Sequence, residues 1–179
     1  LGYGNIGRAI AKRAKAFDMK VMALTRTPRA LDPKPDFLGG YDALPQVLGA
    51  VDFFIICCPL TDDTRGMIGA AELAAMQPSA VVINVARGHI ADESALYHAL
   101  RDGVIAGGIL DTWYHYPTAD DPNIRPSRQP FHELENVLMT PHISGWSEGQ
   151  QIRRWEKTGD NLEALLTGGD LINVIRPSR

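Results

Sequence analysis

Gly2-Tyr3-Gly4-Asn5-Ile6-Gly7 opens the chain as a loop of the form G-x-G-x-x-G, and this stretch decides the fold class. The first glycine of such a loop permits a tight turn, the second lets the backbone approach a pyrophosphate, and the third lets a helix pack closely on the sheet. A helix is predicted directly afterwards, over residues 6–17, with its N-terminal N–H groups facing the phosphates. The loop therefore predicts a dinucleotide-binding domain whose cofactor contacts include Gly2, Gly4, Asn5, Ile6 and Gly7.

Short apolar runs alternate with helical stretches along the rest of the chain. Such runs are typical of parallel strands buried on both faces, and their alternation with helices predicts right-handed βαβ units. The expected fold class is α/β, a doubly wound, mainly parallel sheet of Rossmann type. Because only Leu1 precedes the loop, we expect the first strand to be truncated. The predicted strands are residues 20–25, 52–57, 80–85, 105–110 and 137–140, and the later helices are 70–76, 93–101 and 148–166.

Composition excludes several classes of partner. The formal net charge is −3 over 179 residues, so there is no basic excess to bind a nucleic-acid backbone. No apolar run approaches the roughly 18 residues of a membrane span, and no membrane partner is expected. The adjacent cysteines, Cys57 and Cys58, disfavour a disulfide between them and indicate reduced thiols in a cytoplasmic protein. No metal site is predicted.

The end of the second predicted strand indicates which dinucleotide is bound. An NAD enzyme usually carries Asp or Glu there, about 20 residues past the glycine loop, to bind the ribose 2′-hydroxyl. This chain has Thr25 at that position, and no carboxylate lies within residues 20–30. Hydroxyl and guanidinium groups suit a 2′-phosphate, which favours NADP over NAD. The candidate contacts are Thr25, Arg26, Thr27 and Arg29; the alternative is that the two arginines are ordinary solvated charges.

Three later stretches carry a family resemblance. Residues 58–68 begin with Cys58-Pro59 and include Thr64, residues 84–96 contain Val85-Ala86-Arg87-Gly88, and residues 140–146 begin with Thr140-Pro141-His142. With the glycine loop, they resemble in order the motifs of the NAD(P)-binding domain of D-isomer-specific 2-hydroxyacid dehydrogenases, in particular the glyoxylate and hydroxypyruvate reductases. The resemblance implies further cofactor contacts at Cys58, Pro59, Thr64, Val85, Ala86, Arg87, Asp111 and His142.

The same resemblance implies catalytic roles. Arg87 matches the family arginine, whose guanidinium holds the carboxylate of a 2-ketoacid and polarises its C2 carbonyl. His142 matches the general acid/base, which protonates the carbonyl oxygen as hydride arrives from the nicotinamide. Asp111 matches an acid that lies near the nicotinamide carboxamide.

One position departs from the family pattern. The family carries a glutamate paired with the catalytic histidine, just before a proline, and Tyr116 stands there in this chain. Three alternatives follow. The Tyr116 hydroxyl orients His142; or Glu133 or Glu135, from the proline-rich residues 114–135, replaces the glutamate; or efficient catalysis has been lost.

The expected function is hydride transfer between NAD(P)H and a small 2-keto or 2-hydroxy acid, by a homodimer joined through its cofactor domains, as the resemblance implies. The alternative is a nucleotide-sensing binding protein of the same fold, like the corepressor branch of the family. Residues 1–167 are expected to form the dinucleotide-binding domain. Residues 168–179, which include Leu171-Ile172-Asn173-Val174-Ile175, resemble a segment that returns towards a substrate domain mostly absent from this chain.

Overall fold

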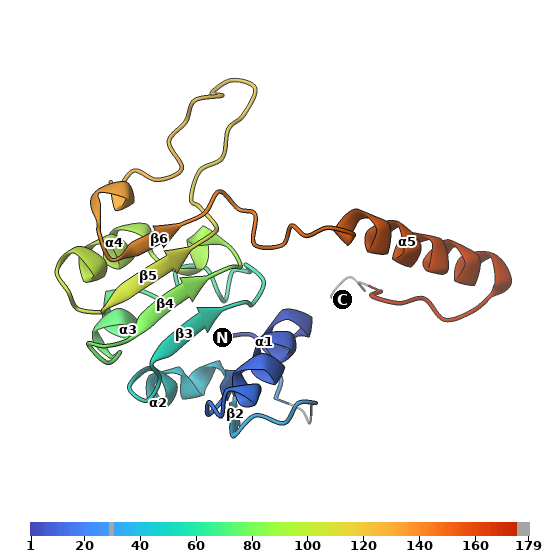
Figure 1. Cartoon of the computed structure of the whole chain (residues 1–179), viewed down its shortest axis with the longest axis horizontal. Coiled ribbons are helices and arrows are strands. Elements are labelled where there is room, and N and C mark those ends of the chain that lie inside the picture. Colours follow the sequence, from blue (N-terminus) through green and yellow to red (C-terminus); the bar gives the residue numbers. More distant parts are fainter. Residues whose placement is uncertain (29–30, 175–179) are drawn as a thin grey trace. The chain divides into compact units, whose positions relative to one another are not determined.

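The computed structural model describes residues 1–28 and 31–174 (Figure 1). Two of the predicted positions, Arg29 and Ile175, lie outside the described residues. The chain divides into two compact units, Leu1–Ser144 and a second unit that begins at Gly145. In the described residues, no helix is both long and apolar enough to cross a membrane.

The first unit is built on parallel strands. Strands β1 (Met22–Leu24) and β2 (Phe37–Gly39) form one pair, with Met22 opposite Phe37. The other four pair in chain order, and every pairing is parallel: β3 (Phe53–Ile56), β4 (Val81–Asn84), β5 (Gly107–Leu110) and β6 (Val137–Met139).

Leu1 and Gly2 occupy the position between β1 and β3. The Gly2 N–H donates to the Leu24 carbonyl at 2.8 Å, and the Cys57 N–H donates to the Leu1 carbonyl at 2.9 Å. Through these bonds Leu1 and Gly2 take the place of a strand between β1 and β3, and the glycine loop begins at the carboxyl end of that strand. A cavity of about 640 Å³ continues the same gap and is lined by residues 20–24 and 52–55.

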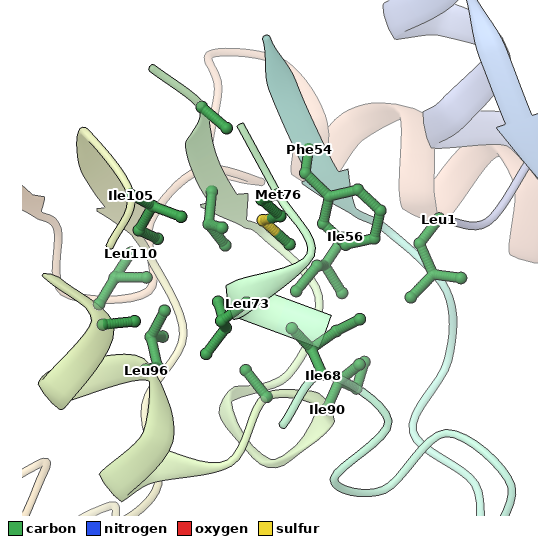
Figure 2. Packing of buried hydrophobic residues seen from close by; sticks show 14 of the residues in the cluster. Leu1, Phe54, Ile56, Ile68, Leu73, Met76, Ile90, Leu96, Ile105 and Leu110 are labelled. Carbon is green, nitrogen blue, oxygen red and sulfur yellow. The ribbon is translucent and has the colours of Figure 1, made fainter. Parts of the chain in front are cut away.

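Helices cover both faces of this sheet, because side chains of successive strand residues point to opposite sides. Ala23 packs with Tyr3 and Ala11, on the side of α1 (Asn5–Ala16). The next residue, Leu24, belongs to the larger core. That core takes side chains from α2 (Leu44–Leu48), α3 (Ala70–Ala74) and α4 (Glu93–Arg101). Figure 2 shows Ile56, Leu73 and Ile90 converging within it.

The predicted fold class is confirmed, and the predicted strands and helices agree with the structure to within a few residues at each end. Two elements, β2 and α2, were not predicted. β2 contains only three residues, and its pairing with β1 rather than an apolar run defines it. α2 contains only five residues, which are too few to show the periodic pattern of apolar residues that predicts a helix.

The proline-rich stretch after β5 is largely irregular, with a single 3-10 turn at Phe131–Glu133. Two features hold it in place. The Glu93 carboxylate, at the start of α4, accepts hydrogen bonds from Ser127 Oγ at 2.6 Å and from the Arg128 N–H at 2.7 Å. Phe131 is buried and packs edge-on against the rings of Tyr97 and Trp113. The loop is therefore anchored to the core at its far end.

The second unit contains α5 (Gln150–Thr167). The helix runs between Gly149 and Gly168, which have left-handed backbones with φ of 76° and 71°. Glycine suits both positions, because a side chain is strained at positive φ. Beyond the helix the chain folds back, so that the side-chain amide of Asn161 bonds the N–H and the carbonyl of Ile172. The domain boundary expected after residue 167 stays a prediction.

Candidate active site

The predicted site residues of the first unit follow the carboxyl ends of its parallel strands. Thr25 comes directly after β1, Cys58 two residues after β3, Arg87 three after β4, Asp111 directly after β5 and His142 three after β6. In an open parallel sheet these ends form one edge, and ligands bind in the crevice outside it. Residues widely spaced in the sequence therefore share one edge of the sheet.

The glycine loop leaves the N-terminus of α1 available to an anion. No side chain of residues 1–28 or 31–174 caps this helix, and its first turn carries no acidic residue, so no described side chain accepts from its leading N–H groups. Asn5 and Ile6 are exposed in that turn, and Ile6 presents more than half of its surface to solvent. A dinucleotide pyrophosphate fits this position.

The three glycines of the loop differ in their surroundings. Gly2 has φ of 94°, and a Cβ there would lie 2.6 Å from the Cys58 nitrogen. A Cβ on Gly7 would collide with the Gly2 carbonyl oxygen. At Gly4, by contrast, no atom lies within 4 Å of an added Cβ. The fold itself therefore requires Gly2 and Gly7, whereas the space above Gly4 is open.

After β1, Thr25 is half-buried and its N–H donates to the Gly39 carbonyl at 3.0 Å. Arg26 and Thr27 follow it in an exposed bend. Thr25 is thus held by β2, while the next two side chains project from the sheet edge.

After β3, Thr64 lies buried in the turn that follows Cys58-Pro59. Its side chain is 1% exposed, and its hydroxyl donates to the Pro59 carbonyl at 2.8 Å and accepts from the Thr61 N–H at 2.8 Å. Thr64 therefore shapes the turn that follows Cys58, and its expected contact with the cofactor stays a prediction. Burial raises the pKa of the Cys58 thiol, which keeps it neutral.

After β4, a buried asparagine supports the arginine. The Asn84 side chain accepts from the Ala86 N–H and donates to the Arg87 carbonyl, both at 3.0 Å. Val85 is half-buried and Ala86 buried, whereas the Arg87 side chain is exposed and donates to the Ala86 carbonyl at 2.6 Å. Asn84 was not among the predicted site residues, although a polar residue at the end of an apolar strand was a detectable signal.

Asp111, after β5, clamps the loop that carries His142. One carboxylate oxygen accepts from Thr140 Oγ1 at 2.6 Å and from the Ile143 N–H at 2.8 Å; the other accepts from the N–H and the hydroxyl of Ser144. Burial by itself would raise the pKa of Asp111, but the hydrogen bonds from Ser144, Thr140 and Ile143 outweigh it and lower the pKa to about 2. The four bonds bracket His142, whose backbone is left-handed with φ of 58°.

Tyr116 lies against His142. The Tyr116 hydroxyl oxygen is 2.9 Å from His142 Nδ1, and the two ring centroids are 5.5 Å apart. The Trp113 N–H donates to the same hydroxyl at 3.0 Å. This geometry corresponds to the first of the three alternatives for the missing glutamate. Glu133 and Glu135 are both exposed, and no hydrogen bond joins either to His142 in the described part of the chain.

The described residues do not bring every predicted catalytic group into contact. No hydrogen bond or ion pair between described side chains joins Arg87 to Asp111, Tyr116 or His142. Within residues 1–28 and 31–174, no group of three His, Cys, Asp or Glu side chains is arranged to hold a metal ion. The site therefore consists of separate polar groups along one edge, among which Asp111 is buried with four hydrogen bonds and His142 is exposed with its ring against Tyr116.

Residues 1–144 match the family described as D-isomer specific 2-hydroxyacid dehydrogenase, NAD binding domain. The chain belongs to this family, as its motifs predicted.

Individual proteins and solved structures similar to this chain agree with the family assignment. A glyoxylate reductase of Pyrococcus furiosus is 40% identical over 169 residues, which are 94% of this chain and 47% of that protein. A D-isomer specific 2-hydroxyacid dehydrogenase from Xanthobacter autotrophicus Py2, solved with NADPH and MES, has a TM-score of 0.83 at 32% identity, covering 98% of this chain and 69% of that one. An NADPH-dependent glyoxylate/hydroxypyruvate reductase from Sinorhizobium meliloti was solved with NADP and malonate. It has a TM-score of 0.77 at 34% identity, and the match covers 96% of this chain and 50% of that one. The chain spans about half the length of the curated relatives it matches.

Proposed function

We propose that the protein is an NAD(P)H-dependent reductase of small 2-ketoacids, which yields the 2-hydroxy acids. The observation that carries the proposal is the setting of His142. Its Nδ1 contacts Tyr116, its loop is clamped by Asp111, and among the described residues no protein group bonds its Nε2. A histidine held in this way, at the ligand-binding edge of a nucleotide domain, is equipped to exchange a proton with a bound substrate.

The roles divide among a few side chains. Arg87 binds the substrate carboxylate and polarises the C2 carbonyl. Protonated His142 gives its Nε2 proton to the carbonyl oxygen, which becomes the hydroxyl of the product. NAD(P)H, when bound, supplies the hydride to C2. Cofactor contacts are proposed at Gly4, Asn5 and Ile6 in the glycine loop, where the uncapped helix and the open space above Gly4 suit a pyrophosphate.

NADP is the proposed preference, through Thr25, Arg26, Thr27 and Arg29. The solved relatives that hold NADPH or NADP support it. Thr25→Asp is expected to lower the affinity for NADPH relative to NADH by about tenfold or more, because the new carboxylate repels the 2′-phosphate. The measurement is the Kd of each cofactor, with Thr25→Asn as an uncharged control of the same size. An unchanged ratio in Thr25→Asp would remove Thr25 from the specificity site.

A pair of glycine variants tests the phosphate position. Gly4→Ala is expected to fold with nearly unchanged stability, because its Cβ enters open space, but to lose much of its NADPH affinity where that Cβ meets the pyrophosphate. Gly7→Ala is expected to lower the melting temperature, because its Cβ collides with the Gly2 carbonyl. Melting curves and NADPH titrations of both variants separate the two effects. Normal NADPH affinity in Gly4→Ala would place the pyrophosphate elsewhere.

The activity itself is tested with the full-length protein, glyoxylate or hydroxypyruvate, and NADPH or NADH. Consumption of NADPH that depends on the ketoacid is the expected result. Cofactor binding without turnover on a panel of 2-ketoacids would favour the nucleotide-sensing alternative instead.

A homodimer is also proposed, and light scattering of the full-length protein tests it; a monomer at micromolar concentration would contradict it. A cytoplasmic location is proposed because Cys57 and Cys58 are free thiols.

A further inference from the structure

The hydroxyl of Tyr116 serves two partners at once. It accepts a hydrogen bond from the Trp113 N–H at 3.0 Å, and it lies 2.9 Å from His142 Nδ1. The Trp113 side chain is itself tied to the histidine loop, since its indole N–H donates to the Thr140 carbonyl at 2.9 Å. Hydrogen bonds from the Trp113 backbone to the phenol and from the Trp113 indole to the histidine loop therefore hold the phenol beside the imidazole.

The inventory of donors and acceptors limits how the contact is made. A phenol has one hydrogen to donate, and the Trp113 N–H already uses acceptor capacity on its oxygen. The remaining hydrogen is directed to the best acceptor nearby, which is the unprotonated nitrogen of a neutral imidazole. If Nδ1 carried the hydrogen instead, the phenol oxygen would accept twice and its own hydrogen would have no protein acceptor among the described residues.

We propose that Tyr116 is a positioning residue that fixes neutral His142 as the tautomer with hydrogen on Nε2 and a lone pair on Nδ1. A carboxylate at position 116 would do the opposite, because it only accepts and would hold a hydrogen on Nδ1. The other ionisable group that bonds this loop is Asp111, and it reaches the backbone and hydroxyls around His142 rather than the ring. The choice of tautomer therefore falls to Tyr116.

The inference rests on the proposed function for its chemical meaning. In reduction the His142 imidazolium gives up its Nε2 proton, and its Nδ1–H donates to the Tyr116 oxygen. The hydrogen of the Tyr116 hydroxyl then turns towards solvent. Water can accept it, because Tyr116 is 42% exposed. In oxidation the neutral ring must accept a proton at Nε2, and the tautomer favoured by Tyr116 has no lone pair there. Oxidation of 2-hydroxy acids at alkaline pH therefore starts from the minor tautomer, and its rate is lowered in proportion to the fraction of neutral His142 that carries hydrogen on Nδ1.

The test is nitrogen NMR of the full-length protein with ¹⁵N-labelled histidine, at a pH where His142 is neutral. The two ring nitrogens of a neutral histidine differ widely in shift, so the spectrum identifies the protonated one. We expect Nδ1 of wild-type His142 to have the shift of an unprotonated nitrogen. In Tyr116→Phe the ratio of the two tautomers is expected to fall by roughly threefold to tenfold, the bias of one ordinary hydrogen bond. In Tyr116→Glu the two shifts are expected to exchange.

Controls make each outcome decisive. His142→Gln identifies the His142 signals by their loss, and the exposed His132 serves as an internal reference that should not respond to changes at position 116. A protonated Nδ1 in the wild type, or an unchanged tautomer ratio in Tyr116→Phe and Tyr116→Glu, overturns the inference. The NMR measurement needs no turnover, so an inactive protein with the expected tautomer would contradict the proposed function and leave the role of Tyr116 standing.

Discussion

His142→Gln is expected to lower the kcat of ketoacid reduction by about 100- to 10,000-fold, the usual contribution of a positioned general acid. Glutamine keeps hydrogen-bonding groups at the position but has no proton to give to the carbonyl oxygen. NADPH affinity should change little, because the proposed pyrophosphate contacts lie on the glycine loop. Steady-state kinetics with glyoxylate, together with NADPH titration, measure the two quantities separately.

The matched control is His132→Gln, the same substitution at an exposed histidine of the long loop, more than half of whose side-chain surface meets solvent. Its kcat should stay within about twofold of wild type, as for other surface changes. A His142→Gln protein with nearly wild-type kcat would falsify the assignment of His142 as the proton donor, even if the protein proved to be a reductase.

Asp111→Asn is expected to destabilise the fold and to impair catalysis together. The aspartate accepts four hydrogen bonds. In an asparagine, an NH₂ group, which cannot accept a hydrogen bond, replaces one carboxylate oxygen and faces two of these donors. We expect the free energy of unfolding at neutral pH to fall by about 2 kcal/mol, the value typical of an aspartate with so low a pKa in the folded state. Since the clamp also holds the left-handed backbone of His142, kcat should fall as well.

The pH dependence of this effect has a definite sign. The pKa of Asp111 is lowered in the folded protein to about 2, from an ordinary value of 3.8. Its stabilisation is therefore complete above pH 4 or so and is lost as the pH falls towards 2. Urea unfolding at neutral pH and near pH 3 should show the gap between wild type and Asp111→Asn narrowing in acid. Asp102→Asn is the control, because that exposed carboxylate bonds its neighbour Arg101 and no other side chain of the described residues. Equal stability of Asp111→Asn and wild type at neutral pH would contradict the clamp.

Much of the architecture could be predicted because it depends on local patterns. The glycine loop, the apolar runs and the alternation of strands with helices specify a parallel sheet, and a parallel sheet places the ends of its strands at one edge. β2 escaped prediction because its three residues are defined by pairing with β1 rather than by their own pattern.

The site could be predicted only to the level of which residues lie at that edge. The place of Asp111 beside the nicotinamide stays a prediction, but the sequence did not reveal that its carboxylate binds Thr140 and Ser144, which are 29 and 33 residues further along the chain. The cofactor contact of Thr64 also stays a prediction, and its hydroxyl closes a turn that the sequence did not indicate. In both cases the side chain has more than one potential partner, and the three-dimensional packing selects between them. For Tyr116 the sequence left three alternatives, because 26 residues separate it from His142.

The Glu93 carboxylate links two segments of the chain that carry predicted site residues. The residue begins α4, just after the segment that carries Arg87, and its carboxylate also holds Ser127 and Arg128 of the loop that carries Tyr116. The loop cannot leave the core without breaking two bonds to a charged acceptor in the first turn of the helix. Release of the proline-rich loop would therefore cost both of these hydrogen bonds, and the same carboxylate joins the helix that follows Arg87 to the loop that follows Tyr116.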